Sequence, residues 1–275
     1  MTLIFFTKFL KGLSVEEVGK TVKALGFDGL DLAVRAGQCV SPENVATALP
    51  DAVNTWKGMG LSVPLASMET RQSDPRDADV RRLFEACGKA KIPDIKIGYW
   101  GWKAGQPYWP AIDAIRKDLA AFQELGRQFG VRTLLHTHSG NYYGSNAGSA
   151  VALVRDCDPR FVGVYLDIAH LMVNGEPLDM ALAMLGDRLA MAAAKNCRYI
   201  LVHEGGPSAV WKREWCLLEH GLVDWRKALE LLNKAGYKGP LSVHGEYAGP
   251  EDREAVLANV AKDIAFLHKI IPSGD

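Results

Sequence analysis

The sequence has few cysteines, and they follow no regular spacing. There are five in 275 residues, and no two of them form a CxxC pair. Disulfide frameworks of small secreted domains use an even number of cysteines at regular spacings. We therefore expect reduced thiols and a cytoplasmic location.

An excess of charge of either sign is also missing. Lys and Arg together number 32, Asp and Glu also number 32, and the formal net charge is zero. Proteins that bind nucleic acid usually have a clustered basic face, and none is visible in this sequence. We expect no nucleic-acid partner.

Long apolar runs are absent as well. The N-terminal stretch MTLIFFTKFLKG is apolar but short, and no small-residue cleavage site follows it. A transmembrane helix needs about 20 predominantly apolar residues. We interpret this stretch as a first β-strand rather than a signal peptide, and we expect no membrane partner.

A glycine-rich phosphate-binding loop is missing after that strand, because KFLKGLS has a single glycine. This argues against a doubly wound open sheet, which usually carries such a loop. The chain instead alternates short apolar runs with amphipathic stretches. The runs predict strands at 3–6, 29–34, 61–67, 94–99, 131–138, 161–167, 199–204 and 240–247.

The stretches between the strands have the signals of helix ends. Residues 14–27, for example, begin with Ser14 and have Glu17 three positions later, which is a capping box, and Gly26 is a plausible helix stop. Each strand and helix together take about 30 residues, the size of a βα unit. Eight such units predict an α/β fold, a single (β/α)8 TIM barrel over residues 1–275.

The ends of the predicted strands hold five of the seven histidines. In parallel barrels the active site is built from these carboxyl ends. The chemically functional side chains at or just after them are Arg35, Glu69, Lys96, Tyr99, Trp102, His136, His138, Asp167, His170, His203, Glu204, His244 and Glu246.

Imidazoles that meet a carboxylate at a barrel mouth suit a divalent metal ion. One residue from each of the last four predicted strands gives His136, Asp167, His203 and His244. We predict that these four hold one ion, Zn or Mn by preference and Fe or Co as alternatives. The alternatives are structural: a strand-end histidine often only completes a hydrogen bond, and Asp167 could cap the next helix.

The segments that surround these residues resemble a known family. GFDGLDLAVR, HTHSG, VGVYLDIAH with the following NGEP, GLVDW and GYKGPLSVHGEY are similar to the xylose isomerase-like barrel superfamily, the sugar phosphate isomerase/epimerase group. The segments run from the second predicted strand to the eighth. The resemblance implies a TIM barrel that acts on a small sugar, and some relatives form dimers or tetramers, so a homo-oligomer stays open.

The resemblance also implies a ligand set. In tagatose- and psicose-type epimerases a metal ion is held by Glu, Asp, His and Glu, and the two glutamates move a proton. Here these positions fall at His136, Asp167, near His203, and at His244. The family's substrate-contacting histidine matches His170. The sequence departs from the family at both glutamates, where it has histidine.

This departure means that the proton must be moved by another group, because a metal-bound imidazole is a poor base. We predict Glu246 as the first candidate, followed by Glu204 and Lys96. The resemblance and the strand ends together assign substrate contacts to Arg35, Glu69, Tyr99, Trp102, His138 and His170. The aromatic segment 99–109 could instead pack as a lid or core, and Arg35 could pair with Asp31.

The sequence thus predicts a metal-dependent isomerase or epimerase that abstracts a proton next to the carbonyl of a small ketose or keto-sugar. Two alternatives stay open: a lyase or hydratase acting on an oxidised sugar, and a degenerate barrel that only binds sugar. Apurinic endonucleases share this barrel, but they need several metals and a basic face for phosphates, so the balanced charge argues against DNA repair.

Overall fold

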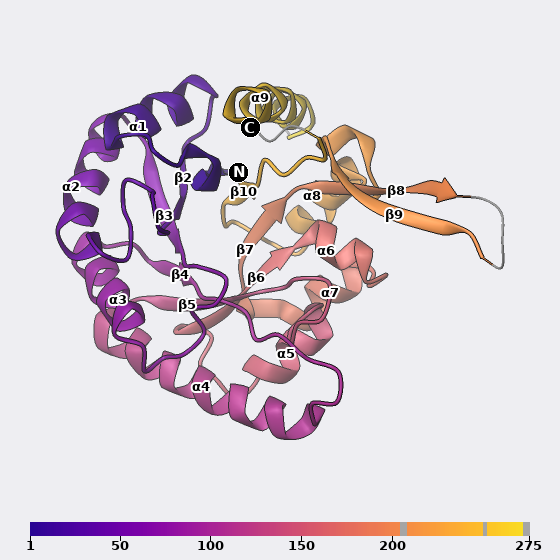
Figure 1. The fold of residues 1–275 in the computed structure, drawn as a ribbon, viewed down its shortest axis with the longest axis horizontal. Helices are drawn as coiled ribbons and strands as arrows, with labels where there is room; N and C mark the ends of the chain where they lie inside the picture. Colours follow the sequence, from indigo (N-terminus) through magenta and orange to yellow (C-terminus); the bar gives the residue numbers. More distant parts are fainter. Residues whose placement is uncertain (204–207, 250–251, 272–275) are drawn as a thin grey trace.

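The eight parallel strands of the structure close into a barrel surrounded by helices (Figure 1). The computed structural model describes residues 1–203, 208–249 and 252–271. Around the barrel the strand order is β1-β10-β7-β6-β5-β4-β3-β2. The bounds are β1 Leu3–Phe6, β2 Gly29–Ala33, β3 Ser62–Ser67, β4 Asp94–Lys96, β5 Arg132–His136, β6 Val162–Asp167, β7 Leu189–Ala194 and β10 Leu241–Val243. The prediction of a (β/α)8 barrel is confirmed.

Helices lie between successive strands and cover the outside of the barrel (Figure 1). They are α1 Val15–Ala24, α2 Val45–Gly58, α3 Ala78–Ala90, α4 Tyr108–Phe129, α5 Ala147–Val154, α6 Ile168–Val173, α7 Leu178–Leu185, α8 Trp225–Lys234 and α9 Arg253–Ile270, with short 3-10 turns η1 Thr7–Leu10, η2 Gly186–Arg188 and η3 Leu218–His220. The capping box expected at the start of α1 is present, since Ser14 and Glu17 bond each other's backbone N–H. None of the helices in the described segments has the length and hydropathy of a membrane span.

Strand alternation determines which side chains face the barrel interior. Leu134 and Tyr165 belong to a small buried cluster separate from the main core. Side chains two residues apart in a strand share a face. His136 therefore points the same way as Leu134, and Asp167 the same way as Tyr165, which places both at the carboxyl end of the barrel interior.

The seventh predicted strand was wrong. The barrel strand at that position is β7, with the sequence LAMAAA, and residues 199–203 belong instead to β8 (Asn196–His203). β8 pairs antiparallel with β9 (Val210–Cys216), and this hairpin extends away from the barrel (Figure 1). Alanine is a strong helix former and a poor strand former, whereas YILVH has the β-branched and aromatic residues typical of strands. Local strand propensity therefore identified a real strand, β8, but not the barrel strand β7.

Candidate active site

A pocket of about 200 Å³ opens at the carboxyl ends of the barrel strands. Typical pockets for drug-sized ligands have volumes of about 300–1,000 Å³, so this one suits a smaller molecule. Its lining residues lie in or follow all eight barrel strands, and they include Lys8, Arg35, Lys96, His136 and His244.

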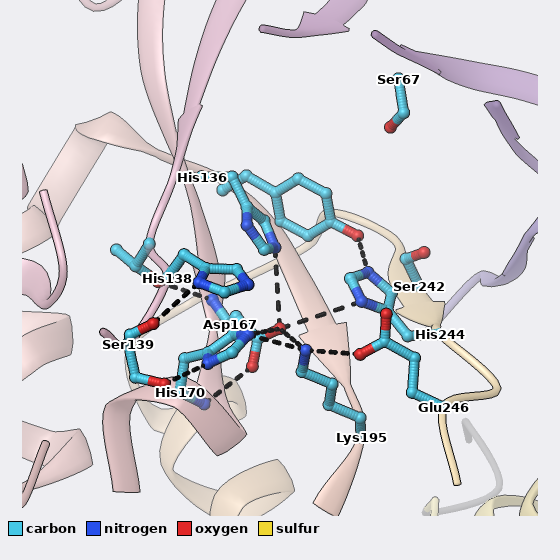
Figure 2. Close-up of polar contacts among 12 residues, drawn as sticks. Ser67, His136, His138, Ser139, Asp167, His170, Lys195, Ser242, His244 and Glu246 are labelled. Atoms are coloured by element: carbon cyan, nitrogen blue, oxygen red, sulfur yellow. Dashed lines mark hydrogen bonds and ion pairs between the residues drawn. The ribbon is translucent and has the colours of Figure 1, made fainter. Parts of the chain in front are cut away.

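Two histidines and one aspartate converge beside this pocket (Figure 2). His136 ends β5, Asp167 ends β6 and His244 follows β10, and one nitrogen or oxygen atom from each lies within 4.8 Å of the others. Asp167 Oδ2 lies 3.6 Å from His136 Nε2 and 3.9 Å from His244 Nδ1. All three side chains are buried. Burial raises the pKa of Asp167 to about 6, against the opposing charge of Lys195.

The outer nitrogen of each imidazole is held by a tyrosine hydroxyl. Tyr99 OH lies 2.7 Å from His136 Nδ1, and Tyr165 OH lies 2.8 Å from His244 Nε2. Metal-binding histidines commonly use their second ring nitrogen in such a contact, which fixes the ring orientation. His136 Nε2 and His244 Nδ1 are thereby left to face Asp167.

The contact between Tyr165 and His244 is continued by a buried carboxylate, that of Asp31. Asp31 of β2 is fully buried and accepts hydrogen bonds from Ser67 Oγ at 2.6 Å, Ser242 Oγ at 2.9 Å and Tyr165 OH at 3.0 Å. Because Tyr165 gives its proton to Asp31, its oxygen can only accept from His244 Nε2–H. His244 Nδ1 therefore carries a lone pair directed towards Asp167.

Within the described residues, two buried atoms of this group make no hydrogen bond of good geometry, His136 Nε2 and Asp167 Oδ2, although the Lys195 ammonium lies 3.3 Å from Asp167 Oδ2. Unpaired buried polar atoms cost free energy unless a ligand satisfies them. Imidazole nitrogens and a carboxylate oxygen so close together fit a divalent cation with nitrogen and oxygen preference. The chemistry of this donor set therefore fits a metal ion.

Lys195, which the sequence reasoning missed, joins the cluster from the end of β7 (Figure 2). Its ammonium lies 2.8 Å from His170 Nε2, 2.8 Å from Glu246 Oε2 and 3.3 Å from Asp167 Oδ2. Burial alone would lower the pKa of Lys195, but the charges of Asp167 and Glu246 outweigh it and raise the pKa. The signal was present as AAAKN, a polar residue after an apolar run, but the alanines did not suggest a strand.

Glu246 is held by two lysines, since Lys8 as well as Lys195 forms an ion pair with it. Burial would raise the pKa of Glu246, but the charges of Lys195 and Lys8 hold it well below its usual range. This carboxylate therefore stays charged at neutral pH.

Lys96 lies on the wall of the pocket opposite Glu246, which follows β10. It ends β4, which is four strands away from β10 in either direction around the barrel. Its side chain is buried, and Nζ lies over the ring of Tyr99 at 4.0 Å from the centroid. Burial, together with the charge of Arg35, lowers the pKa of Lys96 to about 7.

His138 and His170 form a second pair of imidazoles next to the cluster. Their ring centroids are 3.9 Å apart, and Ser139 contacts Nδ1 of both, through its carbonyl at 2.9 Å from His138 and its hydroxyl at 2.7 Å from His170. Burial lowers the pKa of His138 to about 4 and that of His170 further. Both rings are therefore neutral at physiological pH.

The base of the hairpin also contacts the site, which the sequence did not suggest. Arg213 donates to Ser139 Oγ at 2.9 Å, and the ring of Trp215 lies 5.0 Å from that of His170. Lys195 Nζ lies 4.2 Å from the centroid of the same ring. β9 thus packs against the residues that hold Lys195.

Only some of the other predicted site residues line the pocket. Arg35 and Tyr99 line the pocket, whereas Glu69 and Trp102 are not among the lining residues. His203 was predicted as a metal ligand, but it is exposed at the end of β8 and is absent from the His136–Asp167–His244 group found in the described residues, so that prediction is wrong. Glu204 lies outside the described residues.

Two of the structural alternatives raised by the sequence can be assessed directly. Asp167 does cap α6, since its Oδ1 accepts from the backbone N–H of His170 at 2.9 Å, but its Oδ2 takes no part in the cap and faces the cluster and Lys195. Arg35 makes no ion pair with Asp31 among the described residues; its guanidinium lies over Phe6 instead.

Comparison with known proteins agrees with this architecture. The family model described as xylose isomerase-like TIM barrel matches residues 20–270. The chain belongs to this family. A search of curated proteins finds no significant match to the chain.

Solved structures of the xylose isomerase-like fold superpose over nearly the whole chain. The 3-keto-D-glucoside 4-epimerase YcjR from E. coli has a TM-score of 0.75 at 14% identity, covering 98% of this chain and 99% of that one. A D-psicose 3-epimerase from Clostridium cellulolyticum H10 has a TM-score of 0.74 at 15% identity, covering 99% and 100%. The probable 3-DHS dehydratase AsbF from Bacillus anthracis has a TM-score of 0.70 at 17% identity, covering 96% and 99%. At these identities the likeness shows the fold.

Proposed function

We propose that this protein is a metal-dependent isomerase or epimerase that moves a proton on the carbon next to the carbonyl of a small sugar. The observation that carries the proposal is the convergence of His136, Asp167 and His244 beside a small pocket. Similar folds among sugar epimerases support the choice of substrate class.

The proposed ligands are His136 Nε2, Asp167 Oδ2 and His244 Nδ1. A divalent ion held there would polarise the sugar carbonyl and make the adjacent C–H bond more acidic. Two imidazoles and one carboxylate favour Zn, Mn or Fe over Mg, which prefers oxygen ligands.

The proposed proton-transfer groups are Lys96 and Glu246. They stand on opposite walls of the same pocket, so each can reach a different face of a bound sugar. Lys96 as the free amine accepts the proton at Nζ. Glu246 is ionised, so the proton returned from the other side would come from the Lys195 ammonium, relayed through Glu246, and Lys195 would regain a proton from solvent as Lys96 releases one. Tyr99 and His138, which line the pocket, would orient the substrate, and Glu69 and Trp102 remain candidates outside its lining. His170 is fully buried with both ring nitrogens in hydrogen bonds, so it would act by positioning Lys195.

Metal binding can be tested without a substrate. We expect chelator-treated protein to take up about one Zn or Mn ion per chain, measured by elemental analysis after dialysis. His244→Ala should lose most of this uptake, because a ligand is removed. His203→Ala is the matched control and should retain it. Equal loss in both variants, or no uptake by the native chain, would contradict the assignment.

The reaction is tested by incubating the metal-loaded protein with a panel of ketoses in deuterated water and following the sugars by NMR. The proposal is supported if solvent deuterium appears at the carbon next to the carbonyl and the product is otherwise an isomer of the starting ketose. An unsaturated product would show a lyase instead. Metal uptake without exchange on any ketose would leave a sugar-binding barrel.

A further inference from the structure

The charged side chains that line the pocket are mostly basic. The basic ones are Lys8, Arg35, Lys96 and Lys195, and the acidic ones are Asp31 and Glu246. Asp31 is committed to three hydroxyl groups beneath the pocket, and Glu246 to Lys8 and Lys195. Across the described residues, Arg35 and Lys96 are the basic pocket side chains that form no ion pair with a carboxylate, and of these Arg35 is always charged.

Arg35 is held in place by contacts that leave its charge uncompensated. Its Nη2 donates to the carbonyl of Met68 at 3.3 Å, and its guanidinium carbon lies 5.1 Å from the centroid of Phe6. Its Nε is buried and has no hydrogen-bond partner in the part of the chain that the structure describes. A guanidinium has five N–H donors in a planar fork, so a fixed Arg35 still offers donors to a ligand.

Lys96, the other basic side chain of the pocket without an ion pair, does not compensate the charge of Arg35 either. Its side chain is only 4% exposed, and the charge of Arg35 acts against the protonated form of its amine. Burial also makes the interaction of the guanidinium with any nearby charge stronger than in water. An anion bound beside Arg35 would compensate the guanidinium charge.

We propose that the sugar bound at this site carries a carboxylate or phosphate, and that Arg35 binds this group. The proposal rests on the proposed function and adds the chemical class of its substrate. The metal cluster lies on the β5, β6 and β10 side of the pocket, whereas Arg35 follows β2. The sugar would therefore span the pocket, with its carbonyl at the cluster and its anionic group at Arg35. Arginine pairs with planar carboxylates and with phosphates through two parallel hydrogen bonds.

The test compares matched ligands by isothermal calorimetry at a fixed ionic strength. The probes are D-fructuronate, D-fructose 6-phosphate, D-fructose and inorganic phosphate. We expect the native protein to bind at least one of the two acidic sugars about 10-fold or more tightly than D-fructose. Arg35→Gln should weaken binding of that acidic sugar about 10- to 100-fold, since a charged hydrogen-bond pair is lost, and should thereby remove most of its preference over D-fructose.

Two further variants make the result specific to Arg35. Arg35→Lys keeps the charge but loses the fork, and should bind the acidic sugar with intermediate affinity. Arg81 also stacks on a phenylalanine, at 5.2 Å from the centroid of Phe129 on the helical side. Arg81→Gln therefore removes the same charge and the same kind of packing away from the pocket, and should leave the preference intact.

The outcomes separate this proposal from the proposed function. A preference for the uronate over the phosphate, or the reverse, identifies the source of the anion, and binding of inorganic phosphate alone would show an adventitious ion only. Equal binding of acidic and neutral sugars, or equal losses in Arg35→Gln and Arg81→Gln, would overturn the proposal. The ratio of the affinities for acidic and neutral sugars can be measured whether or not the protein turns the sugar over. Failure of the proposed reaction therefore does not decide whether Arg35 binds an anionic group.

Discussion

Replacing Lys96 by methionine is expected to lower the rate of deuterium exchange into the ketose about 10²- to 10⁴-fold, the usual contribution of a general base. Metal uptake should stay unchanged, since Lys96 is not in the ligand group. Methionine fills nearly the same volume in a buried position, so the fold should tolerate it.

The physical reason lies in the placement and protonation of the amine. Lys96 is buried at the end of β4 with Nζ directed at the Tyr99 ring, and its pKa is lowered to about 7 by burial and by Arg35. A base whose pKa lies near the working pH combines a large free-amine fraction with good proton affinity. Glu246, with its pKa far below the usual range, is a weaker acceptor.

The same assignment predicts a pH dependence. The free amine of Lys96 exists above its pKa, so the exchange rate should rise as pH increases through about 7 and level off above it. The charged groups that act on Lys96 are Arg35, Lys8, Asp31 and Glu69. Lys96→Arg, which stays protonated throughout, should be as slow as Lys96→Met and should lose the rise. A methionine variant with the native rate and profile would show that another group is the base.

The sequence predicts the barrel well because strand and helix signals in a βα repeat are local. Apolar runs between capped amphipathic stretches indicate the elements, and closure then brings every strand end to one rim. His136, Asp167, His244, Glu246 and Lys96 could therefore be grouped from a single sequence. Their convergence follows from topology rather than from any short motif.

The parts that the sequence did not reveal have identifiable physical causes. Lys195 was missed because β7 is a run of alanines buried between neighbouring strands, where tertiary packing overrides helix preference. His203 was misplaced because the following hairpin has stronger strand character than β7. Which of the two segments enters the barrel depends on how the strands are arranged in space. Neither strand propensity nor sequence spacing encodes that arrangement.

Asp31 and Tyr165 were missed for a different reason. They lie inside strands rather than at their ends, in GLDLA and VGVYLD, where a polar side chain is masked by its apolar neighbours. Their role appears only when β2, β6 and β10 are placed around one interior. A polar residue on the inward face of a barrel strand is the signal that could have identified them.

Replacing Asp31 by asparagine is expected to move the proton of His244 from Nε2 to Nδ1 and to lower metal affinity about 10- to 100-fold, the range seen when outer contacts of a metal ligand are removed. Asp31 can only accept from Tyr165, so Tyr165 must accept from His244. The amide of asparagine can donate to Tyr165 instead. Tyr165 would then donate to Nε2 and leave the proton on the nitrogen that faces Asp167.

Two measurements check this chain of contacts. Nitrogen-15 NMR of the metal-free protein reports the tautomer of His244 directly, and competition with a chromophoric chelator gives the metal affinity. Tyr165→Phe, which removes the hydroxyl, should weaken metal binding without enforcing either tautomer. The control is Tyr143→Phe, because Tyr143 OH is also buried but has no hydrogen-bond partner among the described residues, and its loss should change neither reading. Since the tautomer is read without metal or sugar, a lone pair still on Nδ1 in Asp31→Asn would refute the relay even if the enzyme proved to be metal-dependent.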